Sequence, residues 1–279
     1  EFISLQTLKN RFMKQLKLMV LTLTLLMGTM FTSCMDSGES GPQQWAGVVK
    51  VNDRVGYVTF TDAAGTELIP TNTIPVTLNA RMAYIYCQVD EGQDLSTNPK
   101  SIKITLLADP TGIDATAITT PKVGESGDVT TNAPVGSLSF VSGYSTVVPF
   151  QFSENTIVLP VLYRVKNVTT TEDIKNELAK HTFTLVCYTD DIKSGDTILK
   201  LYLRYKVEDE PAAIAERATR TSSFKAYEIS QILREYTLKS GQTKPAKITI
   251  VAQQNEYNNK LEDTSTTEKV YEIEYKTAE

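Results

Sequence analysis

From Trp45 to the carboxyl end, apolar and polar residues alternate with a period of two over most of the chain. Successive side chains of a β-strand point to opposite faces of a sheet, so this pattern predicts strands with one buried face. Residues 45–109 carry four such segments and a short fifth one at 74–78, the number of strands expected of a small closed barrel. Residues 146–279 carry seven, at 147–152, 156–165, 181–189, 197–207, 222–229, 246–253 and 269–275. Seven short strands separated by turns favour a β-sandwich, so the expected fold class is all-β.

The segment between these two units has a different composition. Residues 109–145 hold five of the 14 glycines and three of the 11 prolines, but only one basic residue, Lys122. Because glycine and proline interrupt regular structure, residues 110–145 are predicted to form a linker or a long loop.

Two short helices are predicted within the sandwich. The first spans 170–180 and follows a Thr169–Glu172 capping box, in which each side chain satisfies a free backbone N–H of the helix start. The second spans 211–217 and begins with a proline, which the first turn of a helix tolerates.

The amino terminus predicts export. Four basic residues precede an apolar run at 18–31, which ends in Thr32-Ser33-Cys34. This order is typical of a secretory signal peptide, and the cysteine at its end resembles that of a bacterial lipoprotein signal. Residues 1–33 are interpreted as the signal peptide, with 1–12 as an upstream extension, and residues 34–44 as a lipidated, flexible tether. The alternative is an ordinary secretory signal with a leftover thiol at Cys34.

Lipidation of Cys34 would make a membrane the first partner of the protein. Each buried methylene contributes about 0.8 kcal/mol, so several acyl chains anchor a protein stably. The expected location is the cell envelope, as an outer-membrane lipoprotein, with periplasmic and surface-exposed orientations both open. Residues 34–279 carry 24 basic and 32 acidic side chains, a net charge of −8. Such a balance argues against nucleic acid, whose phosphates require clustered Lys and Arg.

The two remaining cysteines, Cys87 and Cys187, share strand faces with apolar residues. They are interpreted as buried small hydrophobic side chains. A disulfide between them is the alternative, since an exported protein permits one.

Several residues of both units resemble the NigD-like lipoproteins of the Bacteroides group. The matching residues are Gly56–Asp62, Gly65, Leu68, Pro70, Arg81 and, late in the chain, Ser223–Ser230. The resemblance implies an OB-like amino-terminal domain and a carboxy-terminal β-sandwich. It provides no catalytic residue to carry over, because the family itself has no defined activity.

The sequence carries no catalytic signature and predicts no cofactor. His181 is the only histidine, and it is expected to interact with the carboxyl end of the first helix, where a cation is favoured. A structural zinc site requires four Cys or His ligands, and only Cys87, Cys187 and His181 remain if Cys34 is lipidated. Adjacent acids at 190–191, 208–210 and 262–263 fall in predicted turns and do not by themselves form a glycosidase pair. The loop 190–196 is interpreted as a solvated hairpin rather than a calcium site.

Binding is therefore the favoured function. An OB-like barrel can bind oligosaccharides, and Tyr84, Tyr86 and Tyr144 are candidate stacking platforms for sugars. The alternative for Tyr84 and Tyr86 is a strand face or a domain interface. The sequence thus predicts a non-enzymatic envelope protein that binds a protein or glycan partner. A glycan-active hydrolase with a carboxylate pair from separate loops is the second hypothesis.

Overall fold

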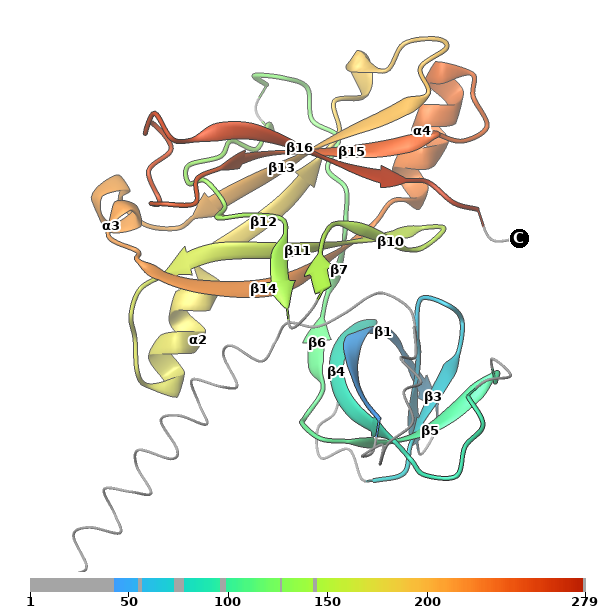
Figure 1. Cartoon of the computed structure of the whole chain (residues 1–279). Helices are drawn as coiled ribbons and strands as arrows, with labels where there is room; N and C mark the ends of the chain where they lie inside the picture. Colours follow the sequence, from blue (N-terminus) through green and yellow to red (C-terminus); the bar gives the residue numbers. More distant parts are fainter. Residues whose placement is uncertain are drawn as a thin grey trace, which may run out of the picture.

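The computed structural model describes residues 43–54, 57–72, 78–95, 99–125, 127–142 and 145–277. The predictions for residues 1–42, including the lipidation of Cys34, and for Tyr144 lie outside these residues. Within them the chain is built mostly of strands, which form a closed barrel and a two-sheet sandwich, so the predicted all-β fold class is confirmed (Figure 1).

The barrel has the strand order β1-β2-β3-β5-β4 and closes through pairing of β1 with β4. Its strands are β1 (Gln44–Arg54), β2 (Tyr57–Thr61), β3 (Glu67–Pro70), β4 (Met82–Val89) and β5 (Ser101–Leu106). All neighbours are antiparallel except β3 and β5, which run parallel. A sixth strand, β6 (Thr111–Ile113), pairs with β4. Five strands in a closed, OB-like barrel are what the sequence predicts. The fifth is β3, whereas the strand predicted at 74–78 lies almost wholly outside the described residues.

Alternation along the strands explains how the barrel core forms. Phe60, Ile85 and Ile104 point inward and are at most 1% exposed, whereas their sequence neighbours point outward. The turn from β2 to β3 has a local cause. Asp62 Oδ1 accepts hydrogen bonds from the N–H groups of Ala64 and Thr66, and Gly65 adopts a φ of 88°, which a residue with a side chain rarely does.

The sandwich consists of two four-stranded sheets. The sheet that faces the barrel, here the inner sheet, has the order β10-β11-β14-β7, and the other, the outer sheet, has the order β12-β13-β15-β16 (Figure 1). The inner strands are β7 (Ala115–Ala117), β10 (Phe150–Ser153), β11 (Thr156–Val165) and β14 (Thr219–Glu228). The outer strands are β12 (His181–Val186), β13 (Ile198–Val207), β15 (Lys247–Gln254) and β16 (Thr267–Glu274). Their facing side chains form the largest apolar core.

Three α-helices flank the sheets, namely α2 (Thr171–Ala179), α3 (Pro211–Ala215) and α4 (Ser230–Ser240), and a 3-10 turn, η1 (Thr189–Asp191), follows β12. The first two confirm the predicted helices. The cap of α2 differs by one residue, because Thr170 rather than Thr169 accepts the hydrogen bond, from Asp173 N–H at 3.1 Å. Helix α4 is not predicted from the sequence, and it ends at Gly241 in the left-handed conformation.

The barrel packs against the inner sheet through a separate apolar cluster. Tyr84 of β4 stacks on Phe224 of β14, with ring centroids 5.5 Å apart, and Val48 and Met82 are also buried there. Parallel aromatic stacking of this kind adds about 1 kcal/mol to the burial of apolar area. The two units are therefore joined by a packed interface as well as by the chain.

The predicted linker, 110–145, contributes to both units over its described part. It supplies β6 to the barrel sheet and β7 to the inner sheet, and a short hairpin, β8 (Phe140–Ser142) with β9 (Ser145–Val147), follows. Val135 and Leu138 are buried in the sandwich core. Gly136 N–H donates to Leu162 O at 2.7 Å, and an added Cβ would lie 3.1 Å from that oxygen. The segment is a long connection whose described middle part packs on the sandwich.

Candidate functional site

The structure places the predicted tyrosine platforms in different environments. Tyr84 is 6% exposed and lies in the interface between the barrel and the inner sheet, which is the alternative given for it from the sequence. Tyr86 is partly exposed, and its hydroxyl donates to Gln44 Oε1. Tyr144 lies outside the described residues. Of the two described tyrosines, Tyr84 is thus buried in the interface and Tyr86 alone is partly exposed.

OB-folds bind oligonucleotides and oligosaccharides on the face formed by strands β2 and β3. In this barrel the polar side chains of that face form hydrogen bonds with one another. Asn52 Nδ2 donates to Thr61 Oγ1 at 2.8 Å, and Thr59 Oγ1 donates to Glu67 Oε1 at 2.8 Å. Arg54 adds an ion pair with Glu67 at 3.3 Å. Because these polar groups bond one another, few of them remain available to a ligand.

His181 belongs to a buried ionic cluster, here called the Glu177 cluster, made of Glu177, His181, Tyr205, Asp209 and Arg217. His181 Nδ1 lies 2.6 Å from the Tyr205 hydroxyl, and Nε2 lies 3.2 Å from Glu177 Oε1. Burial lowers the pKa of His181, so the imidazole is neutral at pH 7. His181 thus contacts the last turn of α2, as predicted, but as a neutral ring rather than as a cation. Its partners are the side chains of Glu177 and Tyr205.

Asp209 Oδ2 accepts hydrogen bonds from Arg217, Lys166 and Lys180 at 3.1–3.2 Å. The two lysines therefore extend the cluster to the surface. These three cations hold the pKa of Asp209 far below its usual range. Burial alone would raise the pKa of Glu177. Hydrogen bonds from Lys166 N–H, Arg217 and His181 outweigh burial and lower it. Every polar group has a partner that fixes it, which is typical of a structural cluster.

The other predicted acids form ion pairs and hydrogen bonds within the protein. Asp190 pairs with Lys239 at 3.0 Å, and Asp263 accepts from Ser265 N–H and from Asn258 Nδ2. Asp196 Oδ2 accepts from Lys193 N–H at 2.7 Å inside the loop 190–196. Within the part of the chain that the structure describes, no three His, Cys, Asp or Glu side chains gather as metal ligands.

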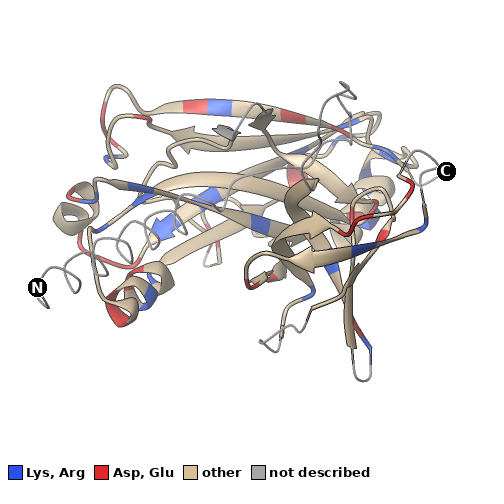
Figure 2. Cartoon of the chain, turned by 60° about the horizontal axis from the view of Figure 1, so that its bottom comes forward, with Lys and Arg blue, Asp and Glu red and all other residues tan. Residues whose placement is uncertain are grey.

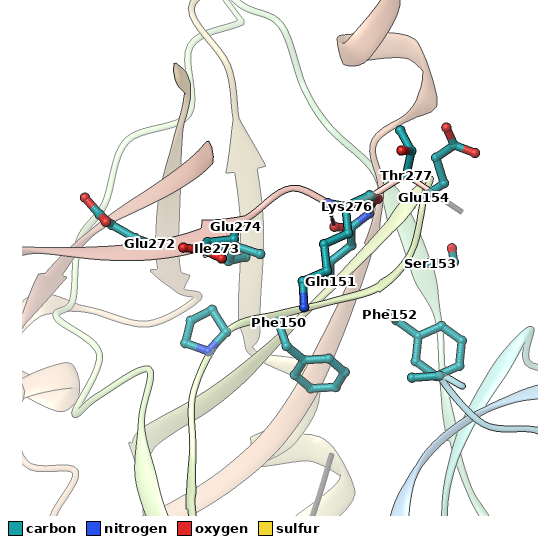
Figure 3. A pocket seen from close by; sticks show the side chains of 12 residues that line it. Phe150, Gln151, Phe152, Ser153, Glu154, Glu272, Ile273, Glu274, Lys276 and Thr277 are labelled. Carbon is teal, nitrogen blue, oxygen red and sulfur yellow. Dashed lines mark hydrogen bonds between the residues drawn. The ribbon is translucent and has the colours of Figure 1, made fainter. Parts of the chain in front are cut away.

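A hollow of about 460 Å³ lies at the open edge of the sandwich, between β10 and β16 (Figure 3). The Gln151 side chain spans it and makes two hydrogen bonds to the backbone of Lys276, at 2.6 and 2.7 Å. Glu154 and Glu272 lie at opposite ends in Figure 3, and Glu272 is paired with Lys247 at 2.8 Å. These carboxylates do not face each other, as the carboxylates of a glycosidase would.

A second hollow, of about 440 Å³, lies on the outer sheet and is here called the Tyr188–Arg204 pocket. It is lined by Asp128, Val129, Thr130, Thr131, Tyr188, Arg204, Gln253 and Leu261. Its volume is within the range of small-molecule sites, about 300–1,000 Å³. The walls come from the long connection, the segment between β12 and η1, strands β13 and β15, and the loop after β15.

A relay of hydrogen bonds fixes the polar wall of this pocket. Arg204 Nη2 donates to the Tyr188 hydroxyl at 2.9 Å, and that hydroxyl donates to Asp128 Oδ1 at 2.9 Å. Gly124 N–H donates to the other carboxylate oxygen at 3.0 Å. The Gly124 N–H and the Tyr188 hydroxyl lower the pKa of Asp128, so its carboxylate is ionised at neutral pH. Asp128 and Arg204 thus carry opposite charges at fixed positions.

Aromatic rings hold the guanidinium of Arg204 in place. Its Cζ lies 5.1 Å from the ring centroid of Tyr202 and 5.7 Å from that of Tyr188. The two rings are themselves packed edge to face at 5.2 Å. Cation–π contacts of this kind contribute about 0.5–2 kcal/mol each. Arg204 is therefore preorganised, and its Nε, like Thr131 Oγ1, is buried without a hydrogen-bond partner among the described residues.

Sequence reasoning missed this pocket, although part of its signal is present. Along β13 the apolar residues 199, 201 and 203 alternate with Lys200, Tyr202 and Arg204, so the three polar side chains share the face opposite the core. Tyr188 and Arg204 are common residues of binding hot spots. The contribution of Asp128 has no sequence signal, because it comes from a connection without regular structure.

Charges on the described surface are mixed. Figure 2 shows acidic and basic residues interleaved over strands and helices, rather than a basic stripe. That nucleic acid is not a partner stays a prediction from the net charge of the sequence. Among the described residues, no helix has the length and apolar content needed to cross a membrane.

One solved structure decides the family of the chain. A "Putative lipoprotein" from Bacteroides fragilis is 95% identical, with a TM-score of 0.79, and the match covers 85% of this chain and 100% of that protein. The chain belongs to the family of this Bacteroides lipoprotein. The predicted membership in a lipoprotein family of the Bacteroides group is thereby confirmed. No family model matches the chain, and no curated protein matches it.

A more distant solved structure shows the same fold. A protein of unknown function, DUF1344, from Bacteroides vulgatus is 10% identical with a TM-score of 0.52, over 84% of this chain and 92% of that protein. A NigD-like immunity protein from Bacteroides caccae is also 10% identical, with a TM-score of 0.46, over 84% of this chain and 94% of its own.

Proposed function

We propose that the chain is a lipid-anchored, non-enzymatic binding module of the cell envelope. The 95% identical relative is described as a lipoprotein and not as an enzyme, which supports an anchor at Cys34 after a signal peptide at residues 1–33. The proposed location is the outer membrane. Strand β1 begins at Gln44, and residues 34–44 are proposed to tether the barrel to the lipid.

The observation that carries the binding role is the Tyr188–Arg204 pocket on the outer sheet. The barrel covers the opposite side of the sandwich, where Tyr84 and Phe224 are buried. The outer sheet instead leaves Ile198 and Val270 about half exposed, at 47% and 57%. A fixed aromatic and guanidinium cluster beside a hollow is typical of a recognition site for a protein or a glycan.

Anchoring and binding are tested separately. We expect the full-length protein to incorporate radiolabelled palmitate and the variant Cys34→Ser to incorporate none. Incorporation of palmitate by the variant would contradict the lipid anchor at Cys34.

For binding, residues 36–279 are applied to a glycan array and crosslinked in envelope preparations. We expect the protein to bind a partner, and the variant Gln253→Ala to lose this binding. Tyr257→Ser, which changes a side chain that is 78% exposed, should retain it. Equal retention by both variants would overturn the pocket as the binding site.

A further inference from the structure

We propose that the Tyr188–Arg204 pocket binds an uncharged saccharide. The inference rests on the proposed binding function and adds the chemical class of the ligand. Three properties of the pocket support it, namely its charge balance, its mixture of hydrogen-bond donors and acceptors, and its apolar walls.

The charge of the pocket is balanced. Among the described residues that line it, Arg204 and Asp128 alone are charged, and the Tyr188 hydroxyl lies between them at 2.9 Å from each. An anionic ligand would face the Asp128 carboxylate, and a cationic ligand would face the guanidinium. A neutral ligand meets neither repulsion, so the pocket favours one.

The polar groups of the pocket both donate and accept hydrogen bonds. Gln253 offers an amide with two donors and one acceptor oxygen, and Thr130 and Thr131 offer hydroxyls. Arg204 and Asp128 add a fixed donor and a fixed acceptor. Neighbouring sugar hydroxyls are themselves donors and acceptors, so they can match such a set, whereas an aliphatic or aromatic ligand would leave these groups unpaired.

Two polar atoms of the pocket residues, Thr131 Oγ1 and Arg204 Nε, are buried and make no hydrogen bond within the described residues, so each would gain a partner from a ligand hydroxyl that reaches it. The relay from Arg204 through Tyr188 to Asp128 holds the other polar groups in place by contacts within the protein. A site that is ordered in advance loses less conformational entropy on binding.

The remaining walls are apolar. Val129 and Leu261 line the hollow together with the ring of Tyr188. Apolar surface of this kind packs against the C–H groups of a sugar ring, while the polar groups fix its orientation. The hollow has about 440 Å³, and a protein partner would also require roughly 800 Å² of contact around it.

The test uses residues 36–279 and two soluble probe sets, neutral oligosaccharides and carboxylated oligosaccharides, followed by titration calorimetry of the best binder. We expect binding to neutral oligosaccharides, weakened at least tenfold by Gln253→Ala and by Thr131→Val, and unchanged in Tyr257→Ser. Tyr188→Phe retains the ring and removes the relay hydroxyl, so it should also weaken binding. Circular dichroism confirms that each variant is folded.

The outcomes separate this inference from the proposed function. Binding of carboxylated oligosaccharides alone would overturn the ligand class. Binding of neutral oligosaccharides that the pocket variants leave unchanged would overturn the site. If no sugar binds but Gln253→Ala abolishes a protein crosslink, the saccharide inference fails and the proposed function stands. If neither sugar nor crosslink depends on the pocket, both fail.

Discussion

Arg217 donates two hydrogen bonds to Glu177, from Nε to Oε1 at 2.7 Å and from Nη2 to Oε2 at 3.2 Å. The two side chains are only 0% and 5% exposed. The pair joins the helix α2 to the segment after α3, and it lies beside the single histidine. A bidentate arrangement of this kind gives geometric specificity as well as energy.

Replacement of Glu177 by Gln is expected to destabilise the protein by about 3 kcal/mol, because Arg217 would then remain buried with a weaker partner. Urea unfolding followed by circular dichroism measures the change. Glu172→Gln is the matched control, since Glu172 is exposed on the same helix, and it should change the free energy of unfolding by about 0.5 kcal/mol at most. Equal effects of the two variants would contradict a structural role of the pair.

The Glu177 cluster also predicts how stability depends on pH. Burial lowers the pKa of His181, so the unfolded chain binds a proton that the folded chain does not, and stability falls as the pH drops below about 6.5. The pKa values of Glu177 and Asp209 are lowered as well, so a second loss begins below about 4.5.

Because the chain has one histidine, the first loss is assigned to it. Urea unfolding at pH 7.5, 5.5 and 4 measures both steps. In His181→Gln the decline between pH 7.5 and 5.5 should be reduced, while the decline below pH 4.5 should remain. An unchanged first decline would show that other groups cause it.

The stacking of Tyr84 on Phe224 predicts energetic coupling between the barrel and the sandwich. Each of Tyr84→Ala and Phe224→Ala removes a buried ring and should destabilise the protein by about 3 kcal/mol. In the double variant the loss should be about 1 kcal/mol smaller than the sum, which is the coupling of a stacked pair. Tyr257→Ala is the exposed control. Strict additivity would show that the two rings do not interact in solution.

Cys87 and Cys187 should be unreactive in the folded protein. Burial raises the pKa of both thiols to about 12, so almost no thiolate is present at neutral pH, and neither sulfur is accessible. Intact-mass analysis of residues 36–279 after alkylation without reductant should show no adduct under native conditions and two adducts in urea. A mass without adducts in urea would indicate the disulfide that the sequence leaves open.

Much of the fold could be predicted from the sequence, because the strands have one buried and one exposed face. The alternation of Ile85 and Cys87 with polar residues locates β4, and that of Leu199 and Leu201 locates β13. Pairing across the long connection is not encoded in any local pattern, so β7 beside β14 is not predicted. The candidate site could not be predicted from the sequence for the same reason. Arg204 is visible on a strand face, but only the folded connection brings Asp128 to Tyr188.

The long connection itself leads to the last prediction. Strand β7 precedes Lys122 in the chain but pairs with β14 of the inner sheet, whereas Val123 is 70% exposed. A specific protease site inserted after Val123 should therefore be cut readily in the folded protein. The two fragments should nevertheless elute together from a gel-filtration column, because β7 and the Tyr84–Phe224 contact hold them, and should separate in urea. Phe224→Ala in the cut protein should promote dissociation. Fragments that separate under native conditions without that change would show that residues 110–145 act as a linker between independent units.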